Sequence, residues 1–175
     1  KKWHKFYYDK TLERLNQFYK NFNKKDRSEK INGNEMTKLS IILNRVNWKD
    51  LAAGCPGQFH GDFHFENILW ESNQKKFVFL DWRQDFGGSI NFGDIYYDLA
   101  KLLHGMIVSH ELIQKNNFFV KWSDNEILFN LKRKKILIET EKYFSNWCVE
   151  KGYSLTKVRI LTALIFLNIA ALHHY

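Results

Sequence analysis

Proline and cysteine are scarce in this sequence, and none of its apolar runs is long. The 175 residues contain one proline and two cysteines. Cys55 and Cys148 lie far apart and lack a zinc-ligand spacing, so we expect reduced thiols and a cytoplasmic protein. The longest apolar run, residues 160–172, includes Thr162 and Asn168 and is shorter than the about 20 residues that cross a bilayer. It predicts a core helix, and we expect no membrane partner.

Positive charge is in excess and aromatic residues are abundant. The formal net charge is +8, 17% of the residues are aromatic and 45% are hydrophobic. This apolar share is enough for a sizeable core, and the length favours one domain over residues 1–175. The charge suits an anionic partner, for which the phosphates of a nucleotide are a more economical explanation than nucleic acid.

Helical periodicity covers most of the chain. Asn34, Asp94 and Ser154 are suitable N-caps, and Gly152 is a suitable helix stop. A charged segment, residues 23–30, predicts a loop. Helices are expected over residues 3–23, from the Asn34 cap to a stop at Gly54, from Asp94 to about residue 115, over residues 132–150 and from residue 155 to about residue 172.

Short strands are predicted between these helices. The expected strands are residues 59–61, 68–71 and 76–81, with a hairpin turn at residues 72–75. A second hairpin is expected to pair residues 118–120 with residues 127–129. The predicted fold class is therefore α+β and mainly α-helical.

The chemistry is concentrated between residues 59 and 82. FHGDFHFENILW contains Asp62 and, five residues on, Asn67, and the later FVFLDW contains Asp81. One carboxylate can accept the proton of a hydroxyl group while an amide and a second carboxylate hold a divalent metal ion on triphosphate oxygens. The pattern favours chemistry on a metal-bound nucleotide.

The motifs resemble one family. HGDFHFEN is similar to the HGD-x-H-x-x-N loop of the aminoglycoside phosphotransferase and choline kinase group, and FLDW is similar to its metal-binding IDW segment. GDIYYDLAKLL, residues 93–103, resembles its GD-x-x-x-DLA helix. The resemblance implies the C-terminal lobe of a protein-kinase-like fold, with a short β-hairpin carrying the catalytic loop. It also implies ATP-dependent transfer of a phosphoryl group to the hydroxyl of a sugar derivative, an amino alcohol or an aminoglycoside.

The same resemblance implies roles for individual residues. Asp62 would be the catalytic base, and Asn67 and Asp81 would bind the Mg²⁺ of Mg-ATP. His60 would brace the loop. His64 stands where protein kinases often have a lysine near the transferred phosphate, so a contact with the nucleotide is expected there.

Two further carboxylates have expected structural roles. Asp94 is predicted to cap a helix, and Asp98 is predicted to be buried and to bind the backbone amides of the HGD-x-H-x-x-N loop. Both would support the loop without taking part in the reaction.

The sequence also departs from the family pattern. No GxGxxG is present, and the 58 residues before the motif predict helix where the family has a strand-rich, ATP-clamping lobe. We therefore expect a C-terminal portion of a longer phosphotransferase, inactive without the upstream lobe. Smaller departures are Glu66, where many relatives have glycine, and Arg83, at the position of the glycine of the kinase DFG motif.

Two other functions fit the residues. His60, Asp62 and His64 alternate as on one face of a strand, and with Asp81 they could bind zinc or iron in a metal-dependent hydrolase. A kinase-like module that binds without catalysis is the other alternative, although it would need none of Asp62, Asn67 and Asp81.

Overall fold

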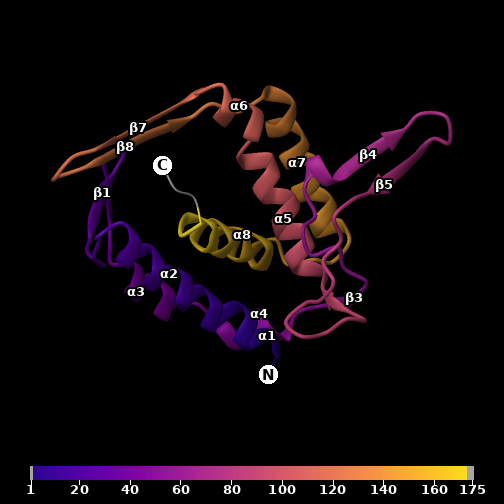
Figure 1. Cartoon of the computed structure of the whole chain (residues 1–175), viewed down its shortest axis with the longest axis horizontal. Helices are drawn as coiled ribbons and strands as arrows, with labels where there is room; N and C mark the ends of the chain where they lie inside the picture. Colours follow the sequence, from indigo (N-terminus) through magenta and orange to yellow (C-terminus); the bar gives the residue numbers. More distant parts are fainter. Residues whose placement is uncertain (1, 173–175) are drawn as a thin grey trace.

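The C-terminal helix lies at the centre of the computed structural model, which describes residues 2–172 (Figure 1). This helix, α8 (Leu155–Ala170), packs against α5 (Ile95–Ile107) and α2 (Lys10–Asn21). The side chain of Ser154 caps it by accepting a hydrogen bond from the Lys157 N–H. Its apolar residues, among them Val158, Leu161, Leu164 and Ile165, are buried. The predicted core helix is confirmed.

The N-terminal helix is continuous over the predicted segment. It consists of α1 (Lys2–His4), a π-helical turn at Lys5–Asp9 and α2, which ends at Asn21. Its apolar face contributes to an aromatic cluster around Phe86, whose side chain is fully buried. The rings packed around Phe86, at centroid distances of 4.4 to 6.3 Å, are Trp3, Phe6, Tyr7, Phe59 and Tyr97. The cluster joins the first helix to α5.

A four-stranded sheet lies on one side of the molecule, at the left of Figure 1. Its order is β2 (Asn34–Met36), β1 (Glu29–Ile31), β8 (Ile127–Leu131) and β7 (Phe118–Trp122). The hairpin of β7 and β8 was predicted and is confirmed. β1 pairs with β8 in parallel, so the sheet joins segments about 100 residues apart in the sequence.

Two predictions near β1 and β2 are wrong. Residues 29–31 form a strand within the predicted loop, and Asn34 starts a strand where a helix cap was expected. Asn32 and Gly33 have φ angles of 48° and 81°, the left-handed pair that makes a tight hairpin turn. The Asn32 side chain also exchanges hydrogen bonds with the backbone of Phe129, both 2.9 Å. The helix begins only at Leu39, as α3 (Leu39–Asn44), and α4 (Trp48–Ala53) follows.

The remaining helices differ from prediction mainly at their ends. The helix that starts after Asp94 ends at Ile107, because Val108 and Ser109 are extended, and the shorter α6 (His110–Gln114) follows. α7 (Lys135–Glu150) is confirmed. The fold class, α+β and mainly helical, is confirmed as well.

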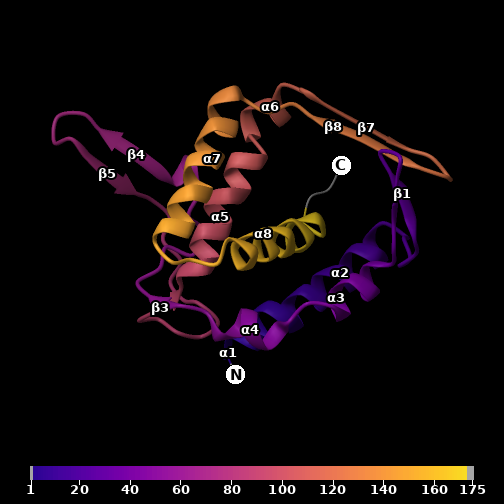
Figure 2. The same cartoon turned by 180° about the vertical axis from the view of Figure 1, so that it is seen from behind.

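A second hairpin projects from the body of the molecule. It consists of β4 (Ile68–Glu71) and β5 (Lys76–Phe79) and was predicted with its turn. Figures 1 and 2 show it on the side opposite β1, β7 and β8. A short strand pair, β3 (Pro56–Gly57) with β6 (Gly93–Asp94), lies at its base.

The described residues show neither a disulfide nor a membrane span. Cys55 and Cys148 are both free thiols. Within residues 2–172, no helix combines the length and the apolar character needed to cross a bilayer.

Candidate active site

The segment between β3 and β4 contains residues 60–67, which we call the HGD loop. Residues 59–61 were predicted as a strand, and this is wrong. The N–H groups of His60 and Gly61 donate to the Asp98 carboxylate over 2.6 and 2.7 Å. Gly61 also has a φ angle of +83°, which few residues other than glycine adopt readily. The loop is therefore held by a side chain of α5 instead of by a neighbouring strand.

Asp94 is the N-cap of α5, Asp98 lies in the first turn of this helix, and both are buried. Asp94 caps the helix by accepting from the Tyr96 N–H, and it also accepts from the Cys55 N–H at 2.8 Å and the Tyr7 hydroxyl at 2.7 Å. Burial raises the pKa of both carboxyls, and their hydrogen bonds oppose this shift. The two side chains tie α5 to the N-terminal helix and to the HGD loop.

Asp62 lies at the exposed side of the HGD loop and forms an ion pair with Lys101 of α5. The Lys101 Nζ is 2.7 Å from Asp62 Oδ1. About one third of the Asp62 side chain is exposed, against 11% for Lys101. One carboxylate oxygen is thus occupied by the ammonium group, and the side chain still faces solvent.

The pKa of Asp62 lies below its usual value. Partial burial acts to raise it, but the hydrogen bond and charge of Lys101, together with the charges of His64 and Arg83, outweigh burial. Asp62 is therefore ionised at neutral pH. An ionised carboxylate can accept a proton or a hydrogen bond.

Asn67 connects Asp62 to the segment that contains Asp81. Its side-chain nitrogen donates to the Asp62 backbone carbonyl at 2.9 Å. The backbone carbonyl of Asn67 accepts from the Leu80 N–H at 2.9 Å. Asp81 follows directly and has a φ angle of +53°, a conformation that aspartate tolerates better than most residues. Its side chain is exposed.

The donor atoms of Asn67 and Asp81 suit magnesium. An amide oxygen and a carboxylate are hard oxygen ligands, the type that Mg²⁺ prefers. The hydrogen bonds of the Asn67 side chain use its nitrogen, and the oxygen is the atom that a cation would bind. Both residues therefore fit the Mg²⁺ of a bound nucleotide.

The two histidines of the HGD loop have different surroundings. His60 is buried, stacks against Trp82 with ring centroids 4.8 Å apart, and receives the Asp62 N–H on Nδ1 at 3.3 Å. His64 Nε2 lies 3.2 Å from Asn67 Nδ2 and 3.5 Å from Asp62 Oδ2. His64 therefore lies between the Asp62 carboxylate and the Asn67 amide.

Nothing in the described residues supports the hydrolase alternative. Within residues 2–172, no three His, Cys, Asp or Glu side chains are grouped so that they could hold a metal ion. His60 is stacked on an aromatic ring, and Asp62 is paired with Lys101.

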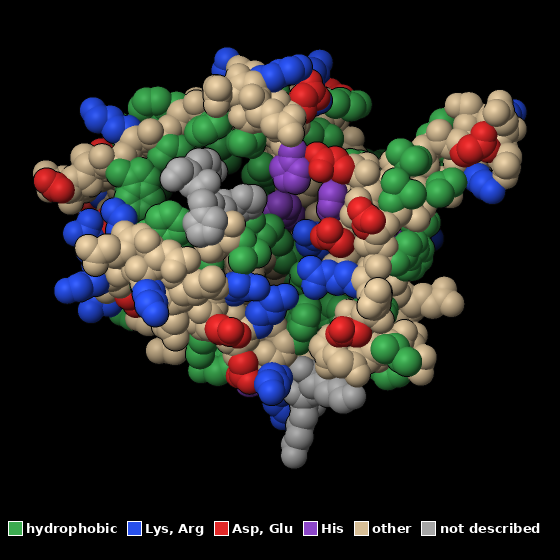
Figure 3. Space-filling view, viewed as in Figure 1, with side chains coloured by type: hydrophobic (Ala, Val, Ile, Leu, Met, Phe, Trp, Pro, Cys, Tyr) green, Lys and Arg blue, Asp and Glu red, His purple; other side chains and the backbone are tan. Residues whose placement is uncertain are grey.

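A large apolar cavity of about 760 Å³ lies between α2, α5, α8 and the β7–β8 hairpin. Its apolar wall includes Phe18, Phe22, Val108, Ile113, Phe118, Val120, Trp122, Leu131, Phe166 and Ile169. In Figure 3, green side chains ring this hollow and purple histidines lie at its edge. His104 and His110 line it, and the His110 ring is 6.3 Å from that of His64. Burial, aided by the charge of Lys101, lowers the pKa of His104 to about 4, so this side chain is neutral at pH 7.

Comparison with known families supports the resemblance seen in the sequence. The model of the phosphotransferase enzyme family matches residues 14–125, which is more than half of the chain. The chain belongs to this phosphotransferase family. The match includes the second half of α2, the HGD loop, Asp81 and α5. No curated protein and no solved structure gives a significant match.

The predicted site residues of this phosphotransferase lie near one another. Asp62, His64 and Asn67 are in direct contact, and Asp81 is tied to Asn67 through the backbone of Leu80. Asp98 holds the HGD loop by accepting hydrogen bonds from the backbone N–H groups of His60 and Gly61. Their roles in a reaction remain proposals.

Sequence reasoning missed Lys101. It lies three residues after Asp98 in α5, so the two side chains share one face of the helix. Because Asp98 was expected to bind the loop, this spacing could have indicated that Lys101 also faces it. The ion pair with Asp62 makes Lys101 part of the candidate site.

We expect Lys101→Met to raise the pKa of Asp62. The substitution removes the cation that lowers this pKa and leaves the burial that raises it. Titration of the Asp62 carboxyl carbon by NMR measures the shift. Lys20→Met, at an exposed position of α2, is the control. An unchanged Asp62 midpoint in Lys101→Met would contradict the assigned cause.

Proposed function

We propose that the chain contains the catalytic portion of a kinase that transfers the γ-phosphoryl group of ATP to the hydroxyl of a small molecule. The observation that carries this proposal is the position of Asn67. Its side chain donates to the backbone carbonyl of Asp62, and its backbone carbonyl accepts from the N–H of Leu80, the residue before Asp81. A base and two magnesium ligands would thus be linked in one hydrogen-bonded unit. Membership of the phosphotransferase family supports the same reaction.

In this mechanism Asp62 orients the acceptor hydroxyl and takes its proton. The hydroxyl oxygen forms a bond to the γ-phosphorus while the bond between that phosphorus and the β–γ bridging oxygen breaks, and ADP leaves with the bridging oxygen. Because the transition state is loose, the nucleophile needs little activation. A carboxylate of low pKa is a weak base, so Asp62 contributes both by orienting the hydroxyl and by accepting its proton as the bond to phosphorus forms.

Asn67 and Asp81 would hold magnesium on the nucleotide. When bound, Mg²⁺ neutralises the charge of the phosphate oxygens. Asn67 precedes β4 and Asp81 follows β5, so both residues lie at the open end of the hairpin, away from its turn. The Leu80–Asn67 hydrogen bond and the left-handed backbone of Asp81 fix this arrangement. Lys101 keeps Asp62 ionised beside them. His64 is adjacent to both Asp62 and Asn67 and would contact the transferred phosphoryl group.

The acceptor is an alcohol, and a sugar derivative, an amino alcohol and an aminoglycoside all have a suitable hydroxyl. Asp62 is on the side of the HGD loop that faces solvent, so an acceptor can reach it. The His64–His110 contact connects this point to the wall of the apolar cavity.

We further propose that ATP requires a covering lobe supplied by a segment upstream of this chain. The strands β1 and β2 pair with β8, on the side of the molecule opposite the HGD loop (Figures 1 and 2). Within the described residues they therefore cannot lie over the phosphates. An ion pair at about 4 Å is worth only about 1 kcal/mol in open water and several times more in a covered site.

Asp62→Asn should lower kcat of the complete encoded protein by about 100- to 10,000-fold, the usual contribution of a positioned base. The KM values for ATP and acceptor should change much less, because the amide keeps the shape of the side chain. Steady-state kinetics with saturating substrates measure both effects. Asp124→Asn, in the β7–β8 turn, is the matched control. Near-normal turnover of Asp62→Asn would show that the base is misassigned.

Asp81→Asn should weaken Mg-ATP binding and abolish most of the transfer, because it removes a charged magnesium ligand. Asparagine tolerates the left-handed backbone at this position, so the fold should be unchanged. The measurements are the Mg²⁺ concentration for half-maximal rate and the circular dichroism spectrum. Asp85→Asn in the same segment is the control. Equal magnesium dependence in Asp81→Asn and the parent would refute the ligand assignment.

The chain of residues 1–175 alone should fold but should bind ATP only at millimolar or weaker affinity. Without the covering lobe, the phosphates of ATP would be contacted from one side only. Since positioning supplies most of the catalysis of phosphoryl transfer, most of the rate would be lost as well. Isothermal titration of Mg-ATP into this chain and into the complete encoded protein tests the difference. Ordinary kinase turnover by residues 1–175 alone would disprove the need for a covering lobe.

A further inference from the structure

Two cationic side chains lie beside Asp62, and a third cation, from another element, lies close to both of them. Lys101 comes from α5, Arg83 from the segment after β5, and Lys10 from α2. The charges of Lys101 and Arg83 both act on Asp62, and both also act on Lys10. Figure 3 shows Lys and Arg side chains gathered at the middle of this face, beside acidic and histidine side chains.

Arg83 is held closely against the HGD loop. Its N–H donates to the His60 carbonyl at 2.9 Å. A Cβ atom on Gly61 would lie 2.7 Å from the Arg83 Cβ and Cδ atoms, so the stem of Arg83 fills the space beside this glycine. The guanidinium carbon is 5.9 Å from the centre of the Tyr97 ring. Arg83 is therefore placed next to Asp62 although its side chain is solvent-exposed.

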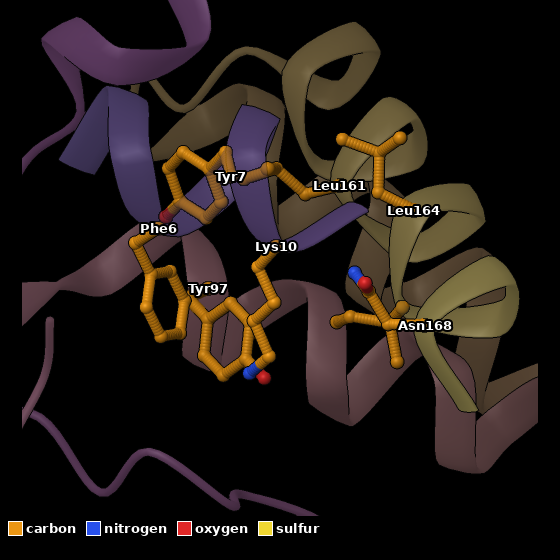
Figure 4. Close-up of a pocket in the computed structure, with 8 residues that line it drawn as sticks. Phe6, Tyr7, Lys10, Tyr97, Leu161, Leu164 and Asn168 are labelled. Carbon is orange, nitrogen blue, oxygen red and sulfur yellow. The ribbon is translucent and has the colours of Figure 1, made fainter. Parts of the chain in front are cut away.

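Lys10 approaches Arg83 and Lys101 from α2. Its Nζ lies 4.6 Å from the centre of the Phe6 ring, and Lys10 and Tyr97 line one small cavity. Figure 4 shows the Lys10 side chain running beside the Tyr97 ring, away from Leu161 and Leu164. Burial and the charges of Arg83, Arg14 and Lys101 lower the pKa of Lys10 to about 8.

Positive charge in this group exceeds negative charge. Asp62 pairs with Lys101, whereas neither Lys10 nor Arg83 forms an ion pair within the part of the chain that the structure describes. Cations that lie close together repel one another and reduce stability unless an anion neutralises them. Binding of an anion would remove this repulsion.

We propose that Lys10, Arg83 and Lys101 form an anion site beside Asp62, and that this site binds a phosphate group. Guanidinium and ammonium groups together suit phosphate, because arginine donates two parallel hydrogen bonds and lysine supplies a compact charge. The phosphate belongs either to the nucleotide or to the acceptor. Use of the site in catalysis rests on the proposed function, whereas binding of the anion does not.

This site narrows the range of acceptors. If the phosphate belongs to the acceptor, the substrate is a phosphorylated alcohol, such as a sugar phosphate. In that case an amino alcohol or an aminoglycoside, which carries positive charge and no phosphate, would be repelled by the three cations.

Binding of inorganic phosphate to the chain in a chloride buffer tests the site directly. Isothermal titration should show saturable binding that weakens as salt is added. The double variant Lys10→Gln and Arg83→Gln should lose at least tenfold in affinity, since a hydrogen bond to a charged group is typically worth about tenfold or more. The double variant Lys20→Gln and Arg45→Gln removes the same charges at exposed positions and should bind like the parent.

Equal affinity in the two double variants would overturn the proposal, as would the absence of saturable binding by the folded parent. Circular dichroism verifies that each variant is folded. If the Lys10→Gln and Arg83→Gln protein does not fold, Arg83→Gln alone decides, because its side chain is exposed and glutamine keeps most of the stem that covers Gly61.

The source of the phosphate is distinguished in the complete encoded protein with a non-hydrolysable ATP analogue and magnesium. Competition between the analogue and inorganic phosphate assigns the site to the nucleotide. Simultaneous binding assigns it to the acceptor, and both results support the site. A protein that binds phosphate through these residues but transfers no phosphoryl group would retain the anion site and refute the proposed function.

Discussion

The contact on which the site depends is the pair of hydrogen bonds from the His60 and Gly61 N–H groups to the Asp98 carboxylate. Both are short, 2.6 and 2.7 Å, and both are buried. Without them two backbone amides would lose their partners in a region that water does not reach, which typically costs about 1–3 kcal/mol for each group. Since Asp98 belongs to the rigid helix α5, the HGD loop takes its position from the helical core. Lys101, one turn further along the same helix, reaches Asp62 for the same reason.

The four carboxylates around this contact lie at two depths. Asp94 and Asp98 are buried and bind backbone N–H groups, which places them in structural positions. Asp62 and Asp81 lie further out, where they can meet a ligand. Lys101 and Arg83 lie beside Asp62, and Lys10 lies close to these two cations. An ionised carboxylate next to several cations suits the proposed phosphoryl transfer. The cations would keep the Asp62 carboxylate ionised and would neutralise the phosphate oxygens.

Prediction from the sequence succeeded where the signal was local. The period of apolar residues predicted the first helix, α7 and α8, and turn residues predicted the β4–β5 and β7–β8 hairpins. It failed where distant segments decide the structure. Residues 29–36 form strands because β8, about 100 residues later, provides a partner for β1. Residues 59–61 are not a strand, because Asp98 takes the hydrogen bonds that a neighbouring strand would have accepted.

The candidate site is divided in the same way. By itself the sequence determined the local part: the spacing of Asp62, Asn67 and Asp81 along a loop and hairpin, and the caps of α5 and α8, all of which involve residues close together in the chain. Only the tertiary structure decided which cations gather beside Asp62 and beside one another. Lys10, Arg83 and Lys101 lie 52, 21 and 39 residues from Asp62 in the sequence, and no periodicity relates them. Their convergence follows from the packing of α2 and α5 on α8 and from the close approach of Arg83 to Gly61, contacts that exist only once the chain has folded.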